Sequence, residues 1–374
     1  MQMNDAITFI AVGDVGPNRE EPFSIFQHTA QYIARSDLAF CQLEPALSRS
    51  GTPLPQARLP MRADPSGAEA IARAGFDVVS FASNHCMDWG REAFEDTIAA
   101  LAEANLKVVG AGSDIREARA PMIAQVRDNA AKVAFLAYNS ILPQGYWATA
   151  DRPGCAPLRA HTVYEPIEHD QPGTPCRIHT YAHRGDLQGM LDDIRQAKAQ
   201  SDVVIVSMHW GIHFVPAVLA DYQRELAYAA IDAGADLILG HHPHILKGIE
   251  VYRGKAIFYS LANFALESPF SFADNLEDKP SHREITALNP DFKRGGKALP
   301  PDSFKSIMVK CLINPEGIQQ VAILPVMIDA QFDPHILQAD DPRFAEVHAY
   351  LKQISEEQGL PWEASVQGDE IRLL

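Results

Sequence analysis

Three histidines crowd the end of an apolar run in the second half of the chain. In "ADLILGHHPHILKG", residues 237–239 stop at Gly240 and are followed by His241, His242 and His244. Neutral imidazole is the commonest nitrogen ligand for metals, and a His-x-His pair on extended backbone places both rings on one side. This spacing indicates a metal site, provided that other segments supply matching ligands.

Polar residues follow four other apolar runs, in "FIAVGD", "LAFCQLE", "VVSFASNHCMD" and "VVIVSMHWG". They are Asp14, Glu44, Asn84, His85, Asp88 and His209. In open α/β sheets the carboxyl ends of the strands border one crevice, so we expect these side chains to converge. A single Asp or Asn after a strand is usually a turn former or helix cap, and a single strand-end His is usually structural. The agreement between separate segments favours a site.

The predicted ligands combine carboxylates, one amide oxygen and several imidazoles. Such a mixed set suits Mn²⁺, Zn²⁺ or Fe²⁺ better than Ca²⁺ or Mg²⁺, which prefer oxygen ligands. A closed structural zinc site is disfavoured, because no cysteine accompanies the predicted ligands. We therefore expect one or two divalent ions that bind an anionic or carbonyl oxygen and generate hydroxide near neutral pH.

The elements that would position these residues alternate between strands and helices. Strand-like runs lie at 7–12, 38–43, 78–82, 108–110, 133–138, 203–208, 237–239 and 256–261. Helical patterns lie at about 65–74, 91–104, 186–200 and 220–233, with a last one at 342–357. This alternation of strands and helices predicts an α/β fold with largely parallel strands covered by helices. Residues 304–329 predict a hairpin around an Asn-Pro-Glu-Gly turn.

Composition is that of an ordinary globule, with 374 residues, 47% of them hydrophobic, and a formal charge of −16. We expect a single domain over 1–374, with lid-like insertions at about 139–183 and 269–301. The negative charge argues against nucleic acid and anionic membranes as partners. Five cysteines without a C-x-x-C pair, and no signal-like or membrane-spanning run, predict a cytoplasmic protein. The pattern does not predict an oligomeric state.

The motifs also resemble a known family when they are taken in order. "GDVG", "LAFCQLEPALS", "FDVVSFASNHCMDWG", "VVGAGSDIREARAP", "HWG" and "ADLILGHHPHILKGIEVYRGKAIFYSLANF" resemble the bacterial poly-γ-glutamate capsule-synthesis (CapA-type) family. That family is similar to the calcineurin-like metallophosphoesterases. The resemblance covers residues 7–264 and implies a four-layer α/β/β/α sandwich with a dinuclear or degenerate metal site at the strand ends.

The resemblance also implies roles for the residues. Asp14 and His244 would bind a first metal, Glu44 stands at the bridging position, and Asn84, His209 and His242 would bind a second metal. His85 would be the acid or transition-state donor. Asp88 would orient it, or else cap the helix that starts near Arg91. His241 would be a second-layer or substrate-binding group, or only a strand-end residue.

This chain departs from the family pattern at three places. The phosphoesterase Asp-x-His reads Asp14-Val15-Gly16, so the first metal loses an imidazole. After "HWG" the family commonly has Glu-Tyr, whereas this chain has Ile212-His213. His213 is then an additional ligand, a substrate contact or a plain loop residue. "YSLAN" replaces "YSLGN" and crowds Asn263, a further candidate substrate contact.

Two functions fit these residues. The first is a metal-dependent hydrolase acting on a small or polymeric anionic substrate, at a phosphoester or at an amide, γ-glutamyl or cyclic imide bond. Arg152 and Arg159 in the predicted lid are candidates for an anion clamp, although they equally fit packing of the lid. The second is a non-catalytic metal-containing protein for polyglutamate or polysaccharide assembly, which the missing imidazole favours.

Overall fold

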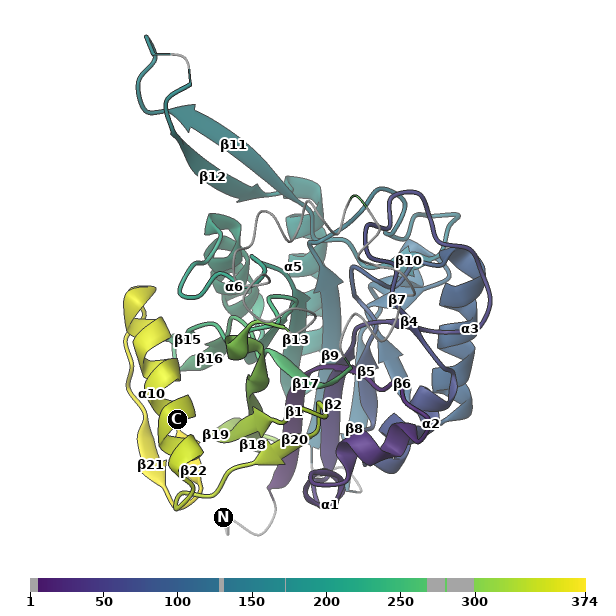
Figure 1. Cartoon of the computed structure of the whole chain (residues 1–374), viewed down its shortest axis with the longest axis vertical. Helices are drawn as coiled ribbons and strands as arrows, with labels where there is room; N and C mark the ends of the chain where they lie inside the picture. Colours follow the sequence, from purple (N-terminus) through teal and green to yellow (C-terminus); the bar gives the residue numbers. More distant parts are fainter. Residues whose placement is uncertain (1–5, 128–130, 172, 268–279, 281–298) are drawn as a thin grey trace.

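The protein has a mixed α/β fold built around two large sheets (Figure 1). The structure is a computed structural model, which describes residues 6–127, 131–171, 173–267, 280 and 299–374. The first large sheet has ten strands and the second has six. The α/β class predicted from the sequence is confirmed.

The first sheet has the strand order β21-β22-β19-β18-β1-β2-β5-β6, with β17 paired to β1 and β20 paired to β19. Its parallel strands are β1 (Ile7–Gly16), β2 (Leu38–Leu43), β5 (Val78–Ser80), β6 (Lys107–Val109) and β17 (Asn263–Leu266). Its antiparallel strands are β18 (Lys305–Asn314), β19 (Gly317–Ile328), β20 (Pro334–Ile336), β21 (Ser365–Gln367) and β22 (Glu370–Arg372). The hairpin predicted over 304–329 is confirmed as β18 and β19.

The second sheet has the strand order β15-β16-β14-β13-β9-β8. Four parallel strands, β9 (Ala131–Asn139), β13 (Val203–His209), β14 (Leu237–His241) and β16 (Lys255–Phe258), form its centre. The edges are β8 (Met122–Val126) and β15 (Ile249–Tyr252), which run antiparallel to their neighbours. Residues of β13 and β14 are fully buried, as expected for parallel strands that read as continuous apolar runs.

The core between the sheets is aromatic. The ring of Phe135 on β9 lies 5.8 Å from that of Phe40 on β2, almost parallel to it, and 5.7 Å from that of Phe9 on β1. The two sheets therefore pack on each other, which places the carboxyl ends of their parallel strands close enough to build one site. A second apolar cluster, which includes Met190 and Leu226, joins helices α5 (Arg184–Lys198) and α6 (Asp221–Ala233) to the second sheet.

Helices α3 (Gly90–Glu103) and α10 (Pro342–Glu357) contact the first sheet. Helix α3 contacts β6 and also α2 (Ser66–Arg73), while α10 packs on β19. The shorter elements are α1 (Ala30–Ile33), α4 (Ile115–Ala118), β3 (Ala46–Leu47), β4 (Arg62–Ala63), β7 (Ala111–Gly112) and β10 (Gly154–Cys155). The five predicted helices all form, with boundaries shifted by two residues at most.

The predicted insertion at 139–183 has structure that the sequence pattern did not predict. Strands β11 (Ala160–Pro166) and β12 (Cys176–Ala182) form a hairpin that projects from the body (Figure 1). Most of its residues are exposed, including the apolar pair Tyr164 and Ile178, which lie opposite each other on the two strands. The insertion predicted at 269–301 falls almost entirely outside the described residues.

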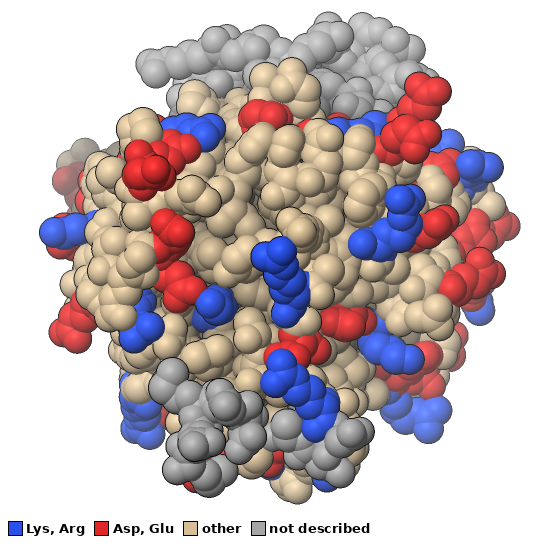
Figure 2. All heavy atoms as spheres, turned by 90° about the horizontal axis from the view of Figure 1, so that it is seen from below, with Lys and Arg blue, Asp and Glu red and all other residues tan. Residues whose placement is uncertain are grey.

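The surface mixes both signs of charge. In the view from below, basic and acidic side chains are interspersed rather than separated into large fields (Figure 2). Among the helices of the described residues, none is long and apolar enough to cross a bilayer.

Candidate metal centre

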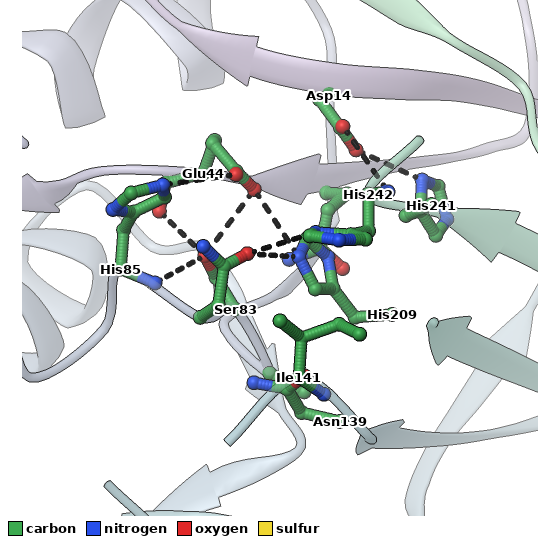
Figure 3. A network of polar contacts seen from close by, with 12 residues as sticks. Asp14, Glu44, Ser83, His85, Asn139, Ile141, His209, His241 and His242 are labelled. Atoms are coloured by element: carbon green, nitrogen blue, oxygen red, sulfur yellow. Dashed lines mark hydrogen bonds and ion pairs between the residues drawn. The ribbon is translucent and has the colours of Figure 1, made fainter. Parts of the chain in front are cut away.

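The six predicted metal ligands lie together at the carboxyl ends of strands from both sheets. Figure 3 labels four of them, Asp14, Glu44, His209 and His242. The first sheet contributes Asp14 from β1, Glu44 directly after β2 and Asn84 after β5. The second sheet contributes His209 at the end of β13, and His242 and His244 directly after β14. The convergence expected from the strand-end positions is present.

One half of the site is centred on Asn84. Its Oδ1 lies 2.6 Å from Nε2 of His209 and 3.1 Å from Nδ1 of His242. Nε2 of His209 also lies 3.7 Å from Oε2 of Glu44. An amide oxygen, two imidazoles and a carboxylate thus point at one volume, and this donor set suits a borderline divalent cation.

The other half uses the opposite oxygen of Glu44. Its Oε1 lies 3.6 Å from Nε2 of His244, whose Nδ1 lies 3.4 Å from Oδ2 of Asp14. Glu44 therefore faces both halves with separate oxygens, as a bridging carboxylate would. Ligand atoms of Asp14, Glu44 and His209 all lie within 4.8 Å of one another.

Packing explains why Gly16 leaves this second half with fewer donors. A Cβ atom at Gly16 would lie 2.7 Å from Leu266 Cδ1 and 2.7 Å from Pro45 Cδ. No side chain fits there without moving these neighbours. The half around Asp14 therefore has two carboxylates and His244, with no imidazole from β1.

The buried carboxylates of the site favour a bound cation. Asp14, Glu44 and His209 are fully buried, and Oδ1 of Asp14, Oε1 of Glu44 and Nδ1 of His209 have no hydrogen-bond partner among the described residues. Buried anions without compensation are costly. Burial and the charge of Asp14 raise the pKa of Glu44 to about 8. Burial lowers the pKa values of His209 and His242, which keeps both imidazoles in the neutral form that binds metals.

His85 lies beside this centre and is held by a buried carboxylate. Its Nδ1 lies 2.6 Å from Oδ2 of Asp88, and its Nε2 lies 3.7 Å from Oε1 of Glu44. Burial alone would lower the pKa of His85, but the charge and hydrogen bond of Asp88, together with Glu44, raise it above its usual value. With 12% of its side chain exposed, His85 lies, like the exposed His213, on the solvent-accessible side of the site, which we call its mouth.

Asp88 is occupied by this site rather than by the following helix. Besides His85, it accepts hydrogen bonds from the Tyr146 hydroxyl (2.7 Å) and the Met61 amide (2.8 Å). Helix α3 begins at Gly90, and no side chain caps it. Of the two roles that the sequence left open, orientation of His85 fits the structure.

The remaining predicted residues lie in three different environments. His241 is fully buried, with Nδ1 3.2 Å from Oδ1 of Asp14, so it contacts a predicted ligand rather than the mouth. Oδ1 of Asn263 lies 2.8 Å from Nδ1 of His244. His213 is exposed, and its ring centroid lies 3.8 Å from that of His242. Substrate binding by any of them stays a prediction.

The two candidate clamp arginines have local partners. Arg159 forms two hydrogen bonds of 2.7 Å to the carboxylate of Asp186, and its guanidinium lies 5.4 Å from the Trp147 ring centroid. Arg152 is exposed and contacts Thr149 at 3.4 Å. These contacts are those expected for packing of the 139–183 segment, and an anion-binding role stays a prediction.

Two residues of the site were not assigned a role from the sequence. Ser83 Oγ lies 2.7 Å from the backbone oxygen of Glu44 and 3.2 Å from its Oε2, and it accepts from the His85 amide at 3.0 Å (Figure 3). Its position directly before Asn84 was the available signal. Tyr146 lies in the predicted lid segment, and no local pattern links it to Asp88, 58 residues earlier.

Comparison with known proteins places these residues in a wider group. The family model for the bacterial capsule synthesis protein PGA_cap matches residues 8–268. The PGA biosynthesis protein CapA of Bacillus subtilis (strain 168) is 31% identical over 245 residues, which cover 65% of this chain and 57% of that protein. The capsule biosynthesis protein CapA of Bacillus anthracis is 30% identical over 275 residues, with coverages of 71% and 61%. A probable polyglutamine synthesis accessory protein of Mycobacterium tuberculosis (strain ATCC 25618 / H37Rv) is 30% identical over 241 residues, with coverages of 64% and 57%. The match thus spans less than two thirds of each of these relatives.

Proposed function

The chain belongs to the bacterial capsule synthesis (PGA_cap) family, and on that premise we propose that it is a metal-dependent hydrolase. The observation that carries the proposal is the position of Glu44, whose two oxygens face His209 on one side and His244 on the other. A bridging carboxylate between two sets of neutral donors is the arrangement used to activate water at a metal. The sheet-on-sheet packing of Phe135 against Phe40 supports the four-layer sandwich that the family resemblance implies.

In the proposed reaction, the metal-binding residues, His85 and Asp88 have separate roles. A divalent ion bound by this site would lower the pKa of a bound water toward ~7 and polarise the substrate oxygen. His85, whose pKa is raised by the charge and hydrogen bond of Asp88 against the opposing effect of burial, would donate a proton to the leaving group. Asp88 keeps the ring oriented through its contact with Nδ1, so that Nε2 faces the site.

We propose Mn²⁺, Zn²⁺ or Fe²⁺ as the ion, bound in two unequal halves. The half around Asn84 has an amide, two imidazoles and a carboxylate, whereas the half around Asp14 has two carboxylates and one imidazole. Fewer donors mean weaker binding, so one ion would be held tightly and a second would require a higher concentration of metal.

The substrate is proposed to be anionic, either small or polymeric. The names of the relatives refer to PGA biosynthesis and to polyglutamine synthesis, which favours an amide or γ-glutamyl bond. The likeness to metallophosphoesterases favours a phosphoester instead, and a cyclic imide is a third candidate. We further propose that the protein is cytoplasmic and that residues 1–374 form a single domain.

The alternative function is non-catalytic assembly or binding of polyglutamate or polysaccharide by a metal-containing protein. It is favoured by one observation, the packing of Gly16 against Leu266 and Pro45, which excludes a histidine from β1. It does not account for the Asp88–His85 pair, because a purely structural metal site does not require an oriented proton donor beside it.

The deciding experiment loads purified protein with each of the three ions and measures metal content and turnover. The probes are p-nitrophenyl phosphate, γ-glutamyl-p-nitroanilide and succinimide, and His209→Ala treated in the same way is the control. We expect about one to two ions per chain and turnover of one probe class, lost in the control. Stable metal binding without turnover of any probe would favour the non-catalytic alternative, and absence of bound metal would refute the hydrolase.

A further inference from the structure

Lys247 is a buried lysine three residues beyond His244. Its side chain is fully buried, and its ammonium donates hydrogen bonds to the carbonyl oxygens of Val215 and, at 2.9 Å, of Val218. Burial lowers the pKa of Lys247 to about 7, and among the described residues no carboxylate opposes that shift. Burying an ammonium costs free energy, and the hydrogen bonds to these two carbonyl oxygens offset part of that cost.

Both acceptors belong to residues 212–219, the segment that leaves the end of β13 shortly after His209. A further contact anchors this segment, because the amide of Phe214 donates to the carbonyl oxygen of Pro243 at 3.1 Å. Phe214 and Ala217 have φ values of 54° and 52°. Non-glycine residues keep such left-handed conformations only where their surroundings hold them. The segment is therefore held in place by its contacts with Pro243 and Lys247.

The segment carries His213 at the mouth of the site. Its exposed ring lies 3.8 Å from the ring centroid of His242 and 5.4 Å from that of His244. Residues 242–247 thus contribute two ligands to the metal centre and also the two anchors of the neighbouring segment. Displacement of the segment would move His213 while leaving the ligands in place.

We propose that Lys247 is a positioning residue, which clamps residues 212–219 so that His213 stays over His242 and meets the substrate at the mouth. The clamp is a property of the fold, whereas the substrate contact of His213 rests on the proposed function. Lys247 does not touch the reacting atoms and acts only through His213.

The clamp is tested by hydrogen exchange, which does not depend on activity. In Lys247→Met, which keeps the length of the side chain but removes the ammonium, the Phe214 amide, which donates to Pro243, should exchange at least ~10-fold faster. The amides of β13 should not change. Lys255→Met is the matched control, because Lys255 pairs with Asp236 (2.7 Å) at the start of β16, the opposite end of the same sheet. Unchanged exchange in Lys247→Met would overturn the clamp.

A measurement on the wild type guards against a variant that does not fold. The Phe214 amide, bonded to Pro243, should be protected in the intact protein. Exchange of this amide at the rate of an unstructured peptide would overturn the proposal whatever the variants do.

The link to His213 is tested by a double-mutant cycle in KM. The substrate is p-nitrophenyl phosphate or γ-glutamyl-p-nitroanilide, whichever the metal-loaded wild type turns over. Lys247→Met and His213→Ala should each raise KM, and the double variant should match His213→Ala alone. Additive effects would overturn the positioning role. If the wild type turns over neither probe, the proposed function fails at those bonds and the exchange experiment alone decides the clamp.

Discussion

The backbone amide of Asp14 donates a hydrogen bond of 3.0 Å to the carbonyl oxygen of Ala262, a residue with a φ of 64°. The contact ties the first predicted metal ligand to the segment that precedes Asn263. It also leaves no room at Gly13, where a Cβ atom would lie 1.9 Å from that carbonyl oxygen. The backbone that supports Asp14 thus includes Ala262 in a left-handed conformation, which costs a non-glycine residue free energy.

Ala262→Gly should stabilise the protein. A left-handed conformation costs a non-glycine residue ~1–2 kcal/mol, which glycine avoids, although glycine loses part of this gain through its freer unfolded chain. We expect a net gain on the order of 1 kcal/mol in the free energy of unfolding, measured by urea denaturation of metal-free protein. Ala265→Gly, in β17 and equally buried, is the matched control and should destabilise. A less stable Ala262→Gly would contradict this account of the backbone.

His209→Ala should lose metal and activity together. The imidazole provides one of the donors around Asn84 and also lies 3.7 Å from the bridging Glu44. Removing such a ligand should weaken metal binding by ~10-fold or more, measured by elemental analysis after dialysis and by titration with Mn²⁺. His161→Ala, on the projecting β11, is the control and should retain both properties. Retention of metal by His209→Ala would remove this residue from the ligand set.

His85→Ala should separate metal binding from turnover. Because His85 is proposed to act as a proton donor and not as a ligand, its loss should leave metal content unchanged and lower kcat by ~10²-fold or more. Asp88→Asn should lower kcat less, by ~10-fold to 100-fold, since it disturbs only the orientation and charge of the ring. The limb of the pH profile that belongs to His85 should be absent in His85→Ala, and in Asp88→Asn it should move to lower pH, because Asp88 raises the pKa of His85. Equal turnover in His85→Ala and wild type would make the histidine structural.

The sequence predicted the convergence of the six candidate ligands because each one is marked locally by the end of an apolar run. Asp14 lies near the end of β1, His209 ends β13 and Glu44 directly follows β2, and parallel strands bring such ends together. The same reasoning located α10 at its observed bounds, Pro342–Glu357. Local pattern sufficed wherever a strand end and a ligand coincide.

Contacts between distant segments were beyond this reasoning. Tyr146 reaches Asp88, and Lys247 reaches the carbonyl oxygens of residues 215 and 218, through tertiary packing that leaves no periodic signal. The projecting hairpin β11–β12 was missed for a different reason, since it lies outside the two large sheets and its apolar side chains, such as Tyr164 and Ile178, are exposed. Side chains that support the site were therefore harder to predict than the ligands they support.

The metal-free protein should become less stable as pH rises from about 5 to 8 because of Glu44. Its pKa is raised to about 8 in the folded protein, against 4.5 for an unperturbed glutamate. Between these values the folded state binds a proton that the unfolded chain has lost. The stability due to this proton is fully present below the unfolded pKa and is lost as pH rises through the folded pKa.

Glu44→Gln isolates this effect from that of the buried histidines. The lowered pKa values of His209 and His242 act in the opposite direction, since the unfolded chain binds their protons at acidic pH. We therefore compare the wild type with Glu44→Gln by urea unfolding in chelator at several pH values. The wild type should lose stability relative to the variant by at most ~1.4 kcal/mol per pH unit across this window.

Metal should cancel the difference in slope by displacing the proton, because the bound carboxylate must be ionised. Calorimetry in buffers of different ionisation enthalpy should then detect about one proton released from Glu44 per metal-binding event at pH 7. Parallel pH profiles of the two metal-free proteins would show that Glu44 is already ionised without a cation, and the electrostatic case for the metal would then fail.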